Sequence, residues 1–151
     1  MRSAETTERR KISVSARARA KSKSKQTELI LRVLVAVMPV TEQQFEAASA
    51  VIADKTVKPV APFTFSDQCR FYGLYKRGTV GRLLPPYEAD DIDTDKRPAS
   101  RPGLLSVTAR AKYDAWAAAQ DMTKQDARDE YVALGQKLVG PPIDEAIEKA
   151  S

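Results

Sequence analysis

Apolar residues recur at helical spacing in four stretches of this 151-residue chain, and no stretch shows the strict alternation of a half-buried strand. In the last stretch, Ala127, Tyr131, Leu134 and Leu138 follow one another at steps of three or four residues. Proline or glycine follows three of the stretches and ends them. We therefore expect an all-α bundle of four helices. The expected helices are residues 42–58, 67–79, 106–120 and 124–138.

Polar residues predict where these helices begin. Thr41 and Gln44 have the spacing of a capping box. Ser66 is expected to cap the second helix, because an acid follows it in the first turn, where the helix dipole favours negative charge. Thr123 is expected to cap the fourth helix. Beyond that helix, residues 143–151 are expected to add only a short acidic turn.

Positive charge is concentrated at the N-terminal end of the chain. Residues 1–32 hold ten Lys and Arg against three acids, a net charge of +7, whereas the rest of the chain has a net charge of −2. A nucleic-acid-binding domain carries its basic excess on the folded part, so no nucleic-acid partner is expected. Residues 1–28 are expected to be disordered. The apolar run 29–40 is shorter than the roughly 20 residues that a bilayer requires.

Three interpretations of this basic extension remain open. It has the composition of an organelle-targeting or anchoring segment, it is a solvated tail, or translation truly starts at Met38. The expected domains are the extension at 1–40, a folded domain at 41–140 and a C-terminal tail at 141–151. A cytoplasmic location is expected, with targeting to an organelle through the basic segment as the alternative.

The chain has no histidine and a single cysteine, Cys69. It therefore lacks histidine-based triads and histidine metal sites, and it cannot form an intramolecular disulfide. An acidic run at 90–95 lies in a long expected loop at 82–101. It lacks the glycine and the distal glutamate of an EF-hand, which favours a solvated loop over a Ca²⁺ site. No catalytic residue and no metal ligand are expected.

Tyr72, Tyr75 and Lys76 stand at positions i, i+3 and i+4, so a helix places two aromatic rings and one ammonium on a single face. Such a face suits a ligand that has a flat heteroaromatic base and phosphates. The alternative is that both tyrosines serve only to pack the helix against its neighbours.

Residues 72–81 resemble the Tyr-x-x-Tyr-Lys-Gln-Ala-Thr-x-Gly segment of the acyl-CoA-binding protein family. Further segments resemble the same family in the same order, and together they cover about residues 41–138. The resemblance implies an up-down-down-up four-helix bundle. It also implies high-affinity binding of long-chain fatty acyl-CoA esters by an intracellular carrier and pool former in lipid metabolism, not an enzyme. The further segments are 45–48 with 58–59, 101–105 with 111–116, and 123–131.

The resemblance assigns roles to individual residues. Tyr75 is the ring on which the adenine would stack. The residues around the 3′-phosphate would be Tyr72, Lys76, Lys112 and Tyr131. The candidates to line the acyl groove are Phe45, Ser49, Ile52, Lys58 and Cys69. For Phe45 and Ile52 the favoured alternative is that they only hold the first helix to the fourth.

Four positions depart from the family pattern, and the mildest change is Tyr113 in place of a tryptophan. Ala53 and Thr108 stand where family members often carry lysine, and Arg82 stands where an acid is usual. Two phosphate contacts are therefore missing. Arg77, Arg82 and Arg110 are additional cations available to substitute for them.

The resemblance implies no cofactor, and it names fatty acyl-CoA as the ligand. Acyl-CoA-consuming enzymes are the expected partners, a transient membrane contact is left open, and a monomer is expected. Two other classes of function were weighed. A thioesterase would need a nucleophile, yet Cys69 has no histidine partner and Ser66 lies on no nucleophile elbow. A binder of nucleic acid or anionic membranes would act through the basic extension.

Overall fold

The computed structural model describes residues 38–91 and 97–151. Residues from Val40 onwards form one compact unit. The expected disorder at 1–28 and most of the apolar run at 29–40 lie outside the described residues, as does most of the acidic run at 90–95.

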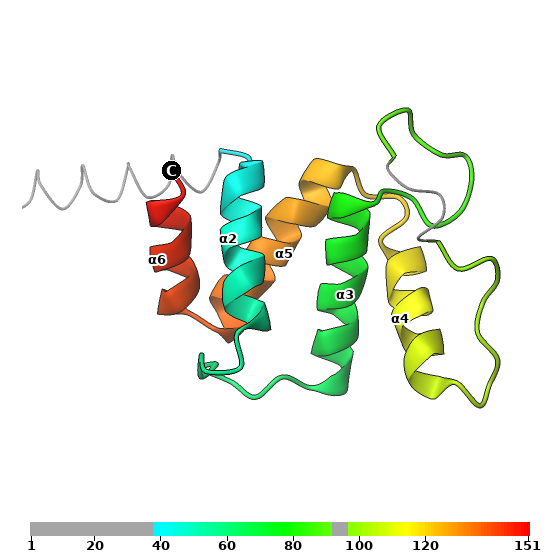
Figure 1. Cartoon of the computed structure of the whole chain (residues 1–151), viewed down its shortest axis with the longest axis horizontal. Helices are drawn as coiled ribbons and strands as arrows, with labels where there is room; N and C mark the ends of the chain where they lie inside the picture. Colours follow the sequence, from blue (N-terminus) through cyan, green and yellow to red (C-terminus); the bar gives the residue numbers. More distant parts are fainter. Residues whose placement is uncertain (1–37, 92–96) are drawn as a thin grey trace, which may run out of the picture. The chain divides into compact units, whose positions relative to one another are not determined.

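The described residues contain five α-helices and no strand, which confirms the all-α class. Figure 1 shows α2 and α5 running opposite to α3 and α4, the up-down-down-up arrangement. Helix α3 packs against α4 and α5, while α2 packs against α5 and α6. The helices are α2 (Glu42–Ala53), α3 (Phe65–Thr79), α4 (Val107–Ala118), α5 (Lys124–Leu138) and α6 (Pro141–Lys149).

Reciprocal capping boxes begin three of these helices. The boxes at Thr41 and Thr123 confirm the predicted starts of α2 and α5. The predicted cap Ser66 is wrong, because Thr64 caps α3 instead. The Thr64 hydroxyl accepts from the Asp67 amide at 3.1 Å, and the Asp67 carboxylate accepts from the Thr64 amide at 2.9 Å. Asp67 is therefore the third residue of the helix, and α3 begins at Phe65.

The short acidic turn expected at 143–151 is instead helix α6, nine residues long. Its two leading prolines occupy the first turn, where a missing amide costs no hydrogen bond, so they start this helix as well as ending α5. Ile143 is completely buried in an apolar cluster with Ala48, Val132 and Val139. Residues beyond 140 thus complete the core around α2.

A second apolar cluster lies between α2, α3 and α5. Phe45, Phe71 and Tyr131 meet there edge to face, with ring centroids 5.1 and 5.2 Å from Tyr131. Such aromatic pairs contribute about 0.5–1.5 kcal/mol beyond the area that they bury. This cluster fixes the positions of the three helices that carry most of the candidate site.

Helix α4 lies very close to α3 at Gly73. A Cβ atom placed on Gly73 would be 2.4 Å from the carbonyl oxygen of Ala115. Because the neighbouring atoms are backbone, no side-chain rotation relieves such a contact. Gly73 is therefore the residue that allows α3 and α4 to lie side by side.

The loop between α3 and α4 is attached to the bundle by buried charges. Arg77 is fully buried, its Nε donates to the Met122 carbonyl at 2.7 Å, and its Nη2 donates to the Glu88 carboxylate at 2.9 Å. Asp91 accepts from the amide of Arg82 at 3.3 Å and pairs with Arg97 at 3.2 Å. Removing one partner of a buried ion pair costs several kcal/mol, so this network holds the loop in place.

We predict that Gly73→Ala destabilises the protein by about 1–3 kcal/mol, because the added methyl group forces α4 away from α3. Urea denaturation measures the free energy of unfolding. Gly103→Ala is the matched control, since a Cβ atom there meets nothing within 4 Å. Alanine in an unobstructed helix would instead stabilise by up to about 1 kcal/mol, so a gain in stability would contradict the close approach.

Candidate functional site

Two lysines lie beside the ring of Tyr72. Lys76, one turn along α3, places its Nζ 5.9 Å from the ring centroid, and Lys112 of α4 places its Nζ 5.1 Å from the same centroid. The close contact at Gly73 brings Lys112 there, because Ala115 and Lys112 lie almost one turn apart on α4. The structure therefore brings together Tyr72, Lys76 and Lys112, which we call the lysine cluster.

The lysine cluster carries two positive charges that no acid of the described residues balances. Within the described residues, neither Lys76 nor Lys112 forms an ion pair. Lys76 also lies 5.6 Å from the ring of Trp116, whose Nε1 donates to the Gly81 carbonyl at 2.9 Å. Aromatic faces attract the ammonium groups but leave their net charge in place. This part of the surface is suited to an anion.

Tyr75 lies on the neighbouring part of α3 and remains 41% exposed. Its ring stacks on Phe45, with centroids 5.8 Å apart and an interplanar angle of 21°, and lies 6.2 Å from the ring of Tyr131. Phe45 and Tyr131 belong to the core, so they hold Tyr75 in a defined orientation. An oriented and partly exposed ring is what stacking of a flat ligand requires.

Burial raises the pKa of the Tyr72 hydroxyl. Burial, together with the neighbouring Tyr75, raises the pKa of Tyr131 much further. Both hydroxyls therefore stay protonated at neutral pH and are able to donate hydrogen bonds to an anion. Within the described part of the chain, neither hydroxyl donates to another residue.

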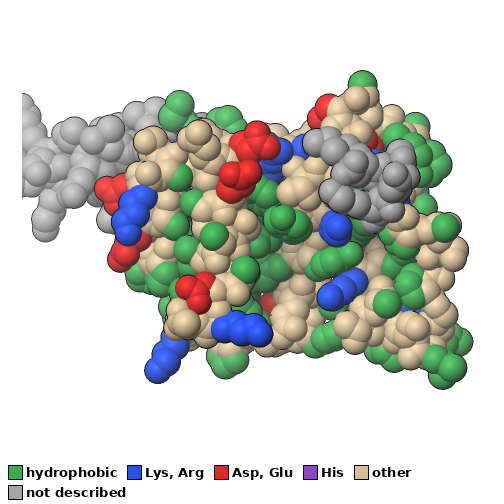
Figure 2. Space-filling model, viewed as in Figure 1, with side chains coloured by type: hydrophobic (Ala, Val, Ile, Leu, Met, Phe, Trp, Pro, Cys, Tyr) green, Lys and Arg blue, Asp and Glu red, His purple; other side chains and the backbone are tan. Residues whose placement is uncertain are grey.

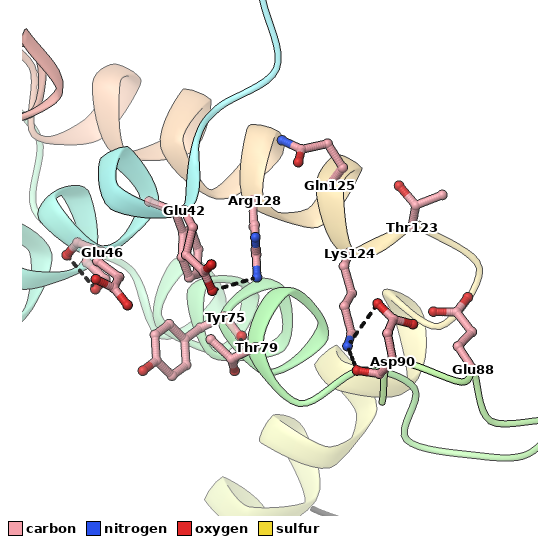
Figure 3. Close-up of a pocket in the computed structure, with 12 residues that line it drawn as sticks. Glu42, Glu46, Tyr75, Thr79, Glu88, Asp90, Thr123, Lys124, Gln125 and Arg128 are labelled. Atoms are coloured by element: carbon pink, nitrogen blue, oxygen red, sulfur yellow. Dashed lines mark hydrogen bonds and ion pairs between the residues drawn. The ribbon is translucent and has the colours of Figure 1, made fainter. Parts of the chain in front are cut away.

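A half-open groove of about 800 Å³ lies next to Tyr75 (Figure 3). Phe45 and Ser49 contribute from α2, and Tyr75 and Thr79 contribute from α3. The rest of the lining is mostly polar or charged and comes from the start of α2, the start of α5 and the loop after α3. These residues are Glu42, Glu46, Glu88, Asp90, Thr123, Lys124, Gln125 and Arg128.

The two cations in the groove are already paired. Figure 3 shows Arg128 directed at Glu42 and Lys124 at Asp90, with N–O distances of 3.3 and 3.2 Å. Arg128 also donates to the Gly78 carbonyl at 3.0 Å and lies 5.7 Å from the Phe45 ring centroid. The groove lining therefore holds twice as many acids as bases, and both of its bases are paired, in contrast to the lysine cluster.

Of the residues predicted to line an acyl groove, the structure places Phe45 and Ser49 in this groove and leaves three outside its lining. Cys69 is buried within α3, and Ile52 packs into the core against α5 and α6. Lys58 is exposed in the loop that follows α2. Helical spacing placed Ile52 on one face with Phe45, but that face extends into the core away from the groove.

Two of the three additional arginines are occupied by structural contacts. Arg77 is buried against Glu88, and Arg82 donates to the carbonyls of Pro86 at 3.0 Å and Gln120 at 3.3 Å. Neither is available to replace the lysines that are absent at Ala53 and Thr108. Arg110 is the remaining candidate, because it forms no ion pair with any residue that the structure describes.

The carboxylates of Glu88, Asp90 and Asp91 offer oxygen atoms within 4.8 Å of one another. Each already faces a cation, because Glu88 pairs with Arg77, Asp90 with Lys124 and Asp91 with Arg97. Their negative charge is thus neutralised within the protein, and nothing in this arrangement calls for a metal ion.

Gly73, Arg77 and Arg128 shape the site, although no local pattern in the sequence assigns them these roles. A glycine inside a predicted helix marks a close backbone contact, and that was the one available signal for Gly73. The partners of Arg77 and Arg128 lie in other elements, as far as 86 positions away for Glu42, so local spacing contains no trace of them.

A sequence model described as acyl CoA binding protein matches residues 42–135. The chain belongs to this family. It is 35% identical over 94 residues to the acyl-CoA-binding protein of Dictyostelium discoideum, covering 62% of this chain and 90% of that protein. It is 29% identical over 98 residues to the acyl-CoA-binding protein homolog of Manduca sexta, and the match covers 65% of this chain and 90% of that protein.

A solved structure supports the same fold. The chain is similar to the crystal structure of ACBP from Moniliophthora perniciosa, with a TM-score of 0.51 and 24% identity over 75% of this chain and 97% of that one. No helix among the described residues has the length and apolar character that crossing a membrane demands.

The buried hydroxyl of Tyr131 predicts a loss of stability at alkaline pH. The free tyrosine pKa is 10.0 and the folded value is higher, so above pH 10 the unfolded chain releases a proton that the folded chain retains. Stability then falls by up to about 1.4 kcal/mol per pH unit. Tyr131→Phe removes the contribution of Tyr131 to this fall and leaves that of Tyr72, so the stability of the variant relative to wild type rises above pH 10.

Denaturant titrations between neutral and strongly alkaline pH measure this difference. Tyr87→Phe, which removes a hydroxyl from an exposed ring, is the control and should follow wild type. A difference between wild type and Tyr131→Phe that is the same at every pH would show that burial does not raise the Tyr131 pKa.

Proposed function

We propose that this protein binds fatty acyl-CoA esters, with the CoA headgroup on α3 and α4 and the acyl chain in the groove between α2, α3 and α5. The observation that supports it best is the lysine cluster beside Tyr75, found in a chain of the acyl CoA binding protein family. An uncompensated positive charge next to an oriented aromatic ring matches the phosphates and the base of a nucleotide.

The 3′-phosphate of CoA is assigned to the lysine cluster. Close to neutral pH this group carries nearly two negative charges, and Lys76 and Lys112 supply two positive ones. The protonated hydroxyls of Tyr72 and Tyr131 add hydrogen bonds with defined direction. Each charge-assisted hydrogen bond contributes on the order of 1.5–3 kcal/mol, which makes this the strongest polar contact of the complex.

The adenine is assigned to Tyr75. Stacking of a base on an aromatic ring contributes about 1–3 kcal/mol. Because Tyr75 stacks on Phe45 and lies near Tyr131, its ring is already oriented before the ligand arrives. The entropy cost of ordering it on binding is therefore small.

The acyl chain supplies the remaining affinity. Each buried methylene contributes about 0.8 kcal/mol, so a covered chain favours long acyl groups over short ones and over free CoA. Phe45 and Tyr75 provide apolar surface, whereas most of the lining is polar. Long-chain preference and high affinity are accordingly the parts of the proposal that a series of chain lengths must test.

A carrier that shields acyl-CoA and delivers it to acyl-consuming enzymes inside the cell needs no catalytic group. The sequence contains no histidine, and its single thiol, Cys69, is buried. We assign no catalytic step to this site. Prolonged incubation with palmitoyl-CoA tests that assignment directly, because steady cleavage of the thioester by the purified protein would establish an enzyme.

Lys76→Ala and Lys112→Ala should each weaken binding of palmitoyl-CoA about 10-fold to 100-fold, since each removes a charge-assisted contact. Isothermal titration calorimetry measures the affinities. The same variants should have little effect on binding of 3′-dephospho-palmitoyl-CoA, which lacks the phosphate that they contact. Lys149→Ala, at an exposed position on α6, is the charge-matched control. Equal losses for both ligands would place the 3′-phosphate elsewhere.

Tyr75→Leu should weaken binding of palmitoyl-CoA and of free CoA by a similar factor, about 5-fold to 100-fold, because it removes the stacking surface for adenine. Tyr75→Phe retains the ring and should retain most of the affinity. Urea denaturation of both variants checks that the loss is not a loss of folding. If Tyr75→Leu binds like wild type, the adenine lies on another surface.

A further inference from the structure

Large apolar side chains are exposed where α4 begins. Leu104, Leu105 and Val107 are 76%, 101% and 65% exposed, respectively. Figure 2 shows hydrophobic side chains at this end of α4. A single exposed leucine is ordinary, but three exposed apolar residues within four positions form a patch that the fold does not bury.

Phe65, 50% exposed, lies at the same end of the α3–α4 pair. The two helices are parallel (Figure 1). They touch where Gly73 meets Ala115. Phe65 is the first residue of α3 and lies eight positions before Gly73. Val107 is the first residue of α4 and lies eight positions before Ala115. We call Phe65, Leu104, Leu105 and Val107 the apolar end.

Basic residues flank the part of the apolar end that leads into α4. Residues 97–112 contain four Lys or Arg and no acid, and of these four Arg97 is buried in its pair with Asp91. Arg101 pairs with Asp114 at the surface, whereas Arg110 and Lys112 form no ion pair with any described residue. Helix α4 also lacks a side-chain cap and an acid in its first turn, so the positive end of its dipole is uncompensated.

We propose that the apolar end docks on the surface of an anionic phospholipid bilayer, with Leu104 and Leu105 inserted among the lipid headgroups. Apolar side chains bordered by basic ones suit this interface, since the bilayer offers hydrocarbon beneath a layer of negative charge. A second copy of the chain fits less well. A stable dimer buries about 800 Å² on each partner, and a two-fold contact here would bring like charges together.

The lysine cluster lies close to this surface. Lys112 follows Val107 by five residues on α4, a rise of about 7.5 Å. Docking would therefore hold the predicted headgroup site near the lipid headgroups, where an acyl-CoA embedded in a bilayer presents its phosphates. Any advantage of this placement for exchange of acyl-CoA with the bilayer rests on the proposed function, whereas the docking itself does not depend on that function.

A dye at position 105 tests the docking in the full-length chain. Leu105→Cys is labelled with an environment-sensitive fluorophore. Wild-type protein treated with the same fluorophore is the control for labelling of Cys69, which is only 7% exposed. With vesicles of phosphatidylcholine and phosphatidylserine, the emission should shift to the blue and be quenched by spin-labelled lipids. The same dye on Val60→Cys, 72% exposed in the loop between α2 and α3, should show neither change.

The double variant Leu104→Ser/Leu105→Ser should reduce the vesicle partition coefficient about tenfold or more, because two leucines no longer leave water. Val60→Ser is the matched control and should partition like wild type. In solution without vesicles, calorimetry should give the double variant the wild-type affinity for palmitoyl-CoA, since neither leucine is placed in the ligand site.

Three results would overturn the proposal. The first is that the protein does not partition onto the anionic vesicles. The second is that the protein partitions while the dye at position 105 stays in water, which would assign membrane binding to the basic extension. The third is a dye response that depends on protein concentration without lipid, which would indicate a second copy. If the dye inserts but no acyl-CoA binds, the proposed function fails and the docking surface stands.

Discussion

The contact between Gly73 and the Ala115 carbonyl is the constraint on which the candidate site depends. It sets the separation of α3 and α4 and so brings Lys112 to the Tyr72 ring, where Lys76 already lies. A bulkier residue would separate the two helices and the two ammonium groups with them. One glycine thus links the packing of the bundle to the charge that an anionic ligand would meet.

The final turn of α3 serves the core and the site at once. Arg77 points inward, fully buried, and ties the loop after α3 to the start of α5 through Glu88 and the Met122 carbonyl. Lys76, its neighbour in sequence, points toward Tyr72 and Trp116. Because the same loop contributes to the groove wall, its attachment at Arg77 also fixes the shape of the groove.

Local chemistry in the sequence predicted much of this fold. Helical periodicity identified α2 to α5, although α2 ends at Ala53 and not at residue 58, and the capping boxes at Thr41 and Thr123 gave the starts of α2 and α5 correctly. The pattern failed where a residue type serves two roles. Ser66 and Thr64 are both good caps, and only the reciprocal bond with Asp67 chooses between them. Pro141 and Pro142 indicate the end of the helix before them, although they also begin α6.

The site was predictable where its residues share one helix, and less so where they meet across helices. Tyr72 and Lys76 needed only helical spacing, but the groove depends on pairings such as Arg128 with Glu42 that no local pattern encodes. One consequence follows from the two lysines beside Tyr72. Two ammonium groups beside one ring repel each other, and dissolved salt or a bound anion would reduce that repulsion. On the proposed assignment, the ligand would in this sense be part of the charge balance of the folded molecule.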